Sequence, residues 1–174
     1  MFVEDKAISE ISKITGLPER VISEIINGQK KLEMATTIEE IKAVYYAALK
    51  VGPLQAADPL QAAAGTKWLE TATTNKEIRD VYLSAPRDSK LKVAAGTKWL
   101  ETATTSEEIR AVFDAATRGS QLEAAAIVKL DEVCMQELEI AITIEEIEAI
   151  RIYTPRGGQS EAASILKMYD ILLA

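Results

Sequence analysis

Basic residues recur at two positions of a repeated pattern, and they are the side chains of this sequence best suited to binding. One series follows a repeated isoleucine and is broken by Glu148; the other lies in connections between expected helices. The six candidate partner-binding residues are Lys42, Arg79 and Arg110 in the first series, and Arg87, Arg118 and Arg156 in the second. Their cationic groups suit a carboxylate-rich partner or a phosphate. The alternative is that they complement the negative carboxyl ends of helices and keep the surface soluble.

Residue types that carry catalysis are scarce. The chain has no histidine, which removes the commonest acid-base group and zinc ligand. Paired glutamates at 39–40, 107–108 and 145–146 lack a third inward ligand, so we interpret them as first-turn residues of helices rather than a metal site. No nucleophile is paired with a base, and no phosphate-binding glycine loop appears. We therefore expect no enzyme activity, no cofactor and no metal.

Net charge, cysteine content and apolar stretches limit the partners and the cell compartment that we expect. The net charge is -7, so nucleic acid would be repelled unless a local basic face overcame it. The single cysteine, Cys134, excludes an intrachain disulfide and is expected to be a small buried side chain. No apolar stretch is long enough to span a bilayer, and Glu4 and Asp5 are unlike a signal peptide. These features predict a cytoplasmic protein with no membrane partner.

A duplicated segment shows how the chain is built. Residues 63–74 and 94–105 are identical, which gives a local period of 31 residues. A Thr-x-x-Glu-Ile motif starts at Thr37, Thr74, Thr105 and Thr143, at steps of 37, 31 and 38. Each motif predicts a capping box at the start of a helix. We attribute the longer steps to inserts at Val51–Ala57 and Val133–Glu139, each adding helical turns or a loop.

Two kinds of helix alternate along the chain, and we name them helix A and helix B. Helix B follows each capping box and carries an apolar stripe, such as Ile41, Val44, Tyr45 and Ala48. Its ends are marked by Gly52–Pro53, Pro86, Gly119 and Pro155. Helix A opens at Asp58, Ser89, Ser120 and Ser160, and we expect its tryptophans, Trp68 and Trp99, in the core.

Such helix pairs must stack to bury their apolar sides, so the pattern predicts an all-α fold of about 10 to 11 helices, as an α-solenoid or a compact helical superhelix. We expect one domain. Its segments are a divergent helix pair at 1–28, repeats at 29–57, 58–87, 88–118 and 119–157, and a capping helix at 158–174. The first pair should turn at Thr15–Pro18 and close at Asn27–Gly28. The last helix is apolar enough either to self-associate or to seal the final repeat.

The unit from Lys67 to Tyr82 followed by Ala85–Ser89, repeated at Lys98–Phe113 and Ala116–Ser120, resembles tandem helical-hairpin repeats of bacterial proteins. It is similar in architecture to HEAT and TPR arrays. The resemblance covers roughly residues 30 to 174, although the TPR signature itself is not matched. It implies binding through an extended surface, usually to another protein.

Residues 8–28 separately resemble a DNA-binding helix-turn-helix, on the pattern Ile11, Gly16, Leu17, Ile22 and Ile25. The segment that would read DNA, residues 19–27, is net acidic, which favours a divergent first repeat instead.

Three functions remain open on the sequence. The leading hypothesis is a non-enzymatic module that binds a protein or peptide on the repeat surface. The alternative is a small acidic inhibitor or immunity-type protein that covers a basic site on its partner. The third is transcriptional regulation through residues 8–28.

Overall fold

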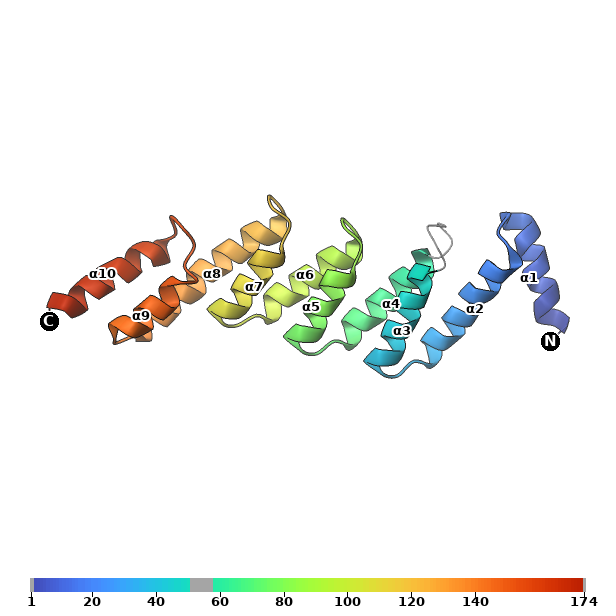
Figure 1. The fold of residues 1–174 in the computed structure, drawn as a ribbon, viewed down its shortest axis with the longest axis horizontal. Helices are drawn as coiled ribbons and strands as arrows, with labels where there is room; N and C mark the ends of the chain where they lie inside the picture. The colour runs from blue at the N-terminus through green and yellow to red at the C-terminus, as the bar shows by residue number, and fades with distance from the viewer. Residues whose placement is uncertain (1, 51–57, 174) are drawn as a thin grey trace. The chain divides into compact units, whose positions relative to one another are not determined.

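The chain is all-α. The computed structural model describes residues 2–50 and 58–173, which form ten helices and no strand (Figure 1). The helices are α1 (Phe2–Thr15), α2 (Glu19–Met34), α3 (Ile38–Lys50), α4 (Asp58–Thr71), α5 (Asn75–Ser84), α6 (Lys90–Thr102), α7 (Ser106–Ala115), α8 (Gln121–Ile140), α9 (Ile144–Arg151) and α10 (Gln159–Leu173). The predicted all-α class and the number of helices are thereby confirmed, and the stacking as an α-solenoid or compact superhelix stays a prediction. The insert at Val51–Ala57, with the helix end expected at Gly52–Pro53, lies outside the described residues.

Two compact units make up the chain, Met1–Leu91 and Lys92–Ala174, with the boundary inside α6. Within each unit, successive helices run up and down as hairpins joined by short turns (Figure 1). The second insert, Val133–Glu139, is helical: it lies within α8, which has 20 residues against 13 in α6. That the units act as one domain stays a prediction.

All four predicted capping boxes form. Thr74, Thr105 and Thr143 each accept from the amide three residues on, and the glutamate there accepts from the threonine amide. Thr37 does the same with Glu40, at 3.3 and 3.1 Å. In each case the glutamate also accepts from the residue before the threonine, as Glu40 does from the Thr36 amide at 2.8 Å. One carboxylate therefore fixes the whole turn between helix A and helix B.

The core follows the predicted apolar stripes. Fully buried side chains include Ile41, Tyr45, Ile78, Ile109 and Ile147 of the B helices. Both tryptophans of the A helices are buried as expected, and the Trp68 ring packs edge-on against Tyr45 at 5.6 Å. These tryptophans are therefore structural.

Glycines at two positions of the first unit leave room for a leucine side chain. A Cβ on Gly28 would overlap Leu60 of α4, and a Cβ on Gly65 would overlap Leu91 of α6. The expectation that a helix closes at Asn27–Gly28 is wrong, because α2 continues to Met34. Gly28 gives room to a leucine from the next A helix and does not mark a helix end.

Lysines connect successive A helices in a way that the sequence did not suggest. The Lys67 ammonium donates to the Leu32 carbonyl near the end of α2 at 2.7 Å. In the second unit, Lys129 donates to the Leu100 carbonyl at 2.6 Å, and Lys167 donates to the Leu138 carbonyl. A cation near a helix carboxyl end satisfies free carbonyls and complements the dipole.

Helix α10 begins differently from the prediction. Ser160 is not its N-cap, because the helix begins at Gln159. Asp131 of α8 instead accepts from the Gln159 and Ser160 amides at 3.1 and 2.9 Å, and from the Ser160 hydroxyl at 2.5 Å. Burial raises the pKa of Asp131, but these hydrogen bonds outweigh it, so the pKa lies below its usual value. A carboxylate from the neighbouring helix thus takes the place of the local cap.

The apolar residues of α10 divide between two faces. Met168 and Ile171 pack against a small core of Leu138, Ala141 and Ile147. The other large apolar side chains are exposed, namely Ile165, Leu166, Tyr169, Leu172 and Leu173. Self-association through this helix stays a prediction.

Candidate binding groove

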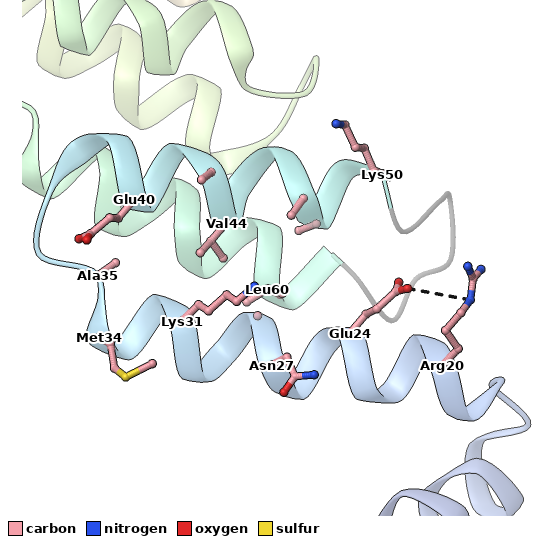
Figure 2. A pocket seen from close by; sticks show the side chains of 14 residues that line it. Arg20, Glu24, Asn27, Lys31, Met34, Ala35, Glu40, Val44, Lys50 and Leu60 are labelled. Atoms are coloured by element: carbon pink, nitrogen blue, oxygen red, sulfur yellow. Dashed lines mark ion pairs between the residues drawn. The ribbon is translucent and has the colours of Figure 1, made fainter.

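A groove of about 780 Å³ opens in the first unit. Figure 2 shows it between α2 and α3, which lie alongside each other, with Leu60 of α4 behind them. Its lining consists of Arg20, Glu24, Asn27, Gly28, Lys31, Met34, Ala35, Glu40, Ala43, Val44, Ala47, Ala48, Lys50 and Leu60. The volume is that of a site that could take several side chains of a ligand.

We refer to the apolar lining residues Ala43, Val44, Ala47, Ala48 and Leu60 as the floor of the groove. Ala43 and Ala47 lie one helical turn apart on α3 and are exposed, while Val44 and Ala48 face the core. Gly28 lets Leu60 come close to α2 and complete the floor. Small side chains on a helix surface let another element approach closely, so this floor suits a ligand that brings its own bulky apolar groups.

Some charged side chains at the rim of the groove are already bonded within the protein, and others are open to a ligand. Glu40 is held by its capping box, where backbone hydrogen bonds from Thr36 and then Thr37 lower its pKa. Glu24 lies 3.9 Å from Arg20 in an exposed pair, which contributes little to stability. Lys31 and Lys50 are exposed and make no ion pair within the part of the chain that the structure describes. The rim therefore offers two lysines to an acidic ligand.

The helix B series of predicted binding residues is largely engaged within the protein. The Lys42 ammonium lies 3.3 Å from an Asp80 carboxylate oxygen and 4.9 Å from the centre of the Trp68 ring. The Arg110 guanidinium lies 3.0 Å from Asp114 and stacks over Phe113 at 5.0 Å. Arg79 is exposed.

The loop series, Arg87, Arg118 and Arg156, is exposed throughout. Of the six predicted residues, the structure brings Arg110 and Arg156 to one pocket in the second unit. It does not bring any of the six to the groove of the first unit.

Sequence reasoning missed Lys50. It lies 37 residues before Arg87, the same step that separates Thr37 from Thr74, so it occupies the loop-arginine position of the first hairpin. The repeat spacing marks this position, although it is occupied by a lysine at the end of a helix and not by an arginine in a loop. The alanines of the floor carried no signal, because which helices flank them depends on tertiary packing.

Among residues 2–50 and 58–173, no three histidine, cysteine or acidic side chains lie together as a metal site would require. Cys134 is buried, and burial, followed by the charges of Glu137 and Asp131, raises its pKa to about 12. A thiol with this pKa is not a nucleophile near neutral pH.

The segment that resembles a helix-turn-helix does form two helices. The predicted turn is present, with Gly16 at a φ of 72° and its amide bonded to the Ser12 carbonyl at 2.8 Å. However, α2 is also the first A helix: Val21 and Ile22 are buried, and Gly28 packs against Leu60. Part of its exposed surface, including Arg20, Glu24 and Lys31, lines the groove.

No helix within the described ranges is both long and apolar enough to cross a membrane. Comparisons with protein-family models, with curated proteins and with solved structures found no match to this chain. The function must therefore be inferred from the groove and its residues.

Proposed function

We propose that this protein is a non-enzymatic interaction module, and that the groove between α2 and α3 binds an amphipathic helix of a partner protein. The observation that carries the proposal is the apolar lining of the groove, in which Ala43 and Ala47 of α3 are exposed beside the buried Val44 and Ala48. Two lysines without ion pairs in the described structure, Lys31 and Lys50, lie at its rim.

A helix suits this groove better than other peptide conformations do. Strand addition needs an exposed sheet edge, and the residues that the structure describes form no strand. Polyproline recognition uses an aromatic-lined groove, and the lining residues include no aromatic side chain. An apolar channel flanked by helices is the form that receives the apolar face of another helix.

Charge sets the second property of the partner. With Glu40 held in its cap and Glu24 paired with Arg20, the groove presents Lys31 and Lys50 on a chain whose net charge is -7. An acidic residue beside the apolar stripe of the partner would match these lysines. We expect apolar contacts to supply most of the affinity and the lysines to set orientation and on-rate.

A displayed library of random amphipathic helices tests the proposal. Selection on the full chain should enrich helices with apolar residues at i, i+3 or i+4, and i+7, together with acidic residues on one flank. Ala47→Glu and Ala43→Glu place a charge on the floor and should reduce binding by at least tenfold. Ala62→Glu is the matched control, since Ala62 is an exposed alanine of α4 that does not line the groove.

The same library separates this function from an acidic inhibitor. Binding in an apolar groove should change little with added salt, whereas binding by long-range charge should weaken steeply. If the enriched helices bind the Ala47→Glu and Ala43→Glu variants as tightly as they bind the wild type, the proposal that they bind in the groove is refuted. Binding that is lost at moderate salt would favour the inhibitor instead.

A further inference from the structure

A second pocket, of about 680 Å³, lies in the second unit and differs in chemistry from the groove. It is lined by Arg110, Phe113, Ile127, Leu130, Arg151, Ile152, Thr154, Pro155, Arg156 and Glu161. Three arginines thus share a cavity with an aromatic ring and several aliphatic side chains. Its volume lies within the range of pockets that hold small organic ligands.

Positive charge in this pocket exceeds negative charge. Asp114 pairs with Arg110 at 3.0 Å, and Glu161, the one acidic lining residue, accepts from the Gly157 amide at 2.7 Å. Arg151 and Arg156 are exposed and have no ion pair within the described part of the chain. Two guanidinium groups are therefore left to bind an anion.

The surroundings hold parts of this pocket in place. Arg110 stacks on the Phe113 ring at 5.0 Å. The Thr154 hydroxyl donates to the Arg151 carbonyl at 2.9 Å, and this buried threonine fixes the turn that follows α9. Asp131 anchors the start of α10, just beyond the loop that carries Arg156.

The ion pairs of the B helices differ between the two units. In the first unit, Lys42 of α3 meets Asp80 of the next B helix, α5. Arg110 of α7 is at the position of Lys42, but the next B helix, α9, has Ala149 at the position of Asp80. Arg110 pairs instead with Asp114 of its own helix, and α9 contributes no carboxylate at this position.

We propose that this pocket binds an organic anion, in which a carboxylate or phosphate is attached to an apolar group. The anion lies against Arg151 and Arg156, which can bind either oxyanion in a bidentate manner. The apolar group lies against Phe113, Ile127 and Leu130. This site is independent of the helix-binding groove, since no residue lines both.

Calorimetric titration of the full chain with four probes tests the proposal: 3-phenylpropionate, phenyl phosphate, inorganic phosphate and the neutral 3-phenylpropanol. At least one of the two aromatic anions should bind saturably, at about 1 mM or tighter for a ligand of this size. Inorganic phosphate should bind at least tenfold more weakly than phenyl phosphate, and the alcohol should not bind measurably. Which aromatic anion binds more tightly identifies the oxyanion.

Two double variants with the same change in net charge provide the control. Arg151→Gln with Arg156→Gln should weaken binding of the aromatic anion at least tenfold. Arg87→Gln with Arg118→Gln removes two exposed loop arginines that do not line the pocket, and it should leave the affinity within twofold. Both are surface changes, and circular dichroism checks that each variant folds.

The proposal is overturned if neither aromatic anion binds, if the alcohol binds as tightly as the acid, or if the two double variants lose affinity equally. Arg156→Lys gives a further check. It retains the charge but not the fork of donors, so an affinity equal to that of the wild type would contradict bidentate binding.

Discussion

Gly65 of α4 should be a position where alanine destabilises the protein although it lies inside a helix. An added Cβ would overlap Leu91 and would lie 3.2 Å from Cε2 of the Tyr45 ring. That ring cannot easily move, because it is fully buried and its hydroxyl donates to the Ser84 carbonyl at 2.8 Å. The new methyl group must therefore displace Leu91 or strain the helix contact.

The magnitude follows from two opposing effects. Alanine is favoured over glycine inside a helix by about 1 kcal/mol. Overpacking a core costs typically about 1 to 3 kcal/mol, and the fixed ring suggests about 2 kcal/mol here. Gly65→Ala should therefore lower the free energy of unfolding by about 1 kcal/mol. With Leu91→Ala present, the overlap with Leu91 is gone and only the 3.2 Å contact with the Tyr45 ring remains, so Gly65→Ala should lower the free energy of unfolding clearly less than it does with Leu91 in place.

Urea unfolding measures how Gly65→Ala changes the free energy of unfolding with Leu91 and with Ala at position 91. A Trp99→Phe background leaves Trp68 as the fluorescent reporter of the first unit. Ala63→Gly, at an exposed site of α4, measures helix propensity alone and should cost about 1 kcal/mol. If Gly65→Ala stabilised the protein with Leu91 in place, the close contact between Gly65 and the Leu91 side chain would be refuted.

Three further predictions concern individual side chains. Hydrogen bonds from the Thr73 and then the Thr74 backbone lower the pKa of Glu77 from 4.5 to about 2. The stability that this carboxylate adds is therefore present above about pH 4.5 and lost as the pH falls towards 2. Glu77→Gln should remove this loss from the dependence of the free energy of unfolding on pH. Identical dependences in the variant and the wild type would contradict the prediction. Cys134, whose pKa is about 12, should react with a disulfide reagent at pH 8 only after unfolding, and rapid labelling of the native protein would show that it is accessible. Asp131→Ala should speed hydrogen exchange at the start of α10, while Glu132→Ala at the next, exposed position should not; equal rates in the two variants would exclude the cap.

Local features of the fold were predictable from the sequence because short-range chemistry determines them. A capping box needs only a threonine and a glutamate three residues apart, so all four positions could be predicted. The apolar stripes of the B helices follow from helical spacing in the same way.

Features that depend on a distant residue could not be predicted. A glycine near the end of a helical pattern can mark a helix end, but Gly28 lies inside α2, where it leaves room for Leu60 from far along the chain. Ser160 is a good N-cap by type, yet Asp131 supplies the cap from another helix. The groove is of the same kind, since its alanines gain a role only once α2, α3 and α4 are packed.

Site-specific photo-crosslinking at the groove tests the central proposal most directly. A benzophenone amino acid replaces Ala47 in one variant and Ala62 in the other, each in the full chain expressed in its native cell. We expect Ala47, and not Ala62, to give an adduct whose linked peptide has an amphipathic helical pattern with acidic residues on one flank. An absence of adduct at Ala47 above the level at Ala62, or a linked peptide without that pattern, would contradict helix binding in this groove.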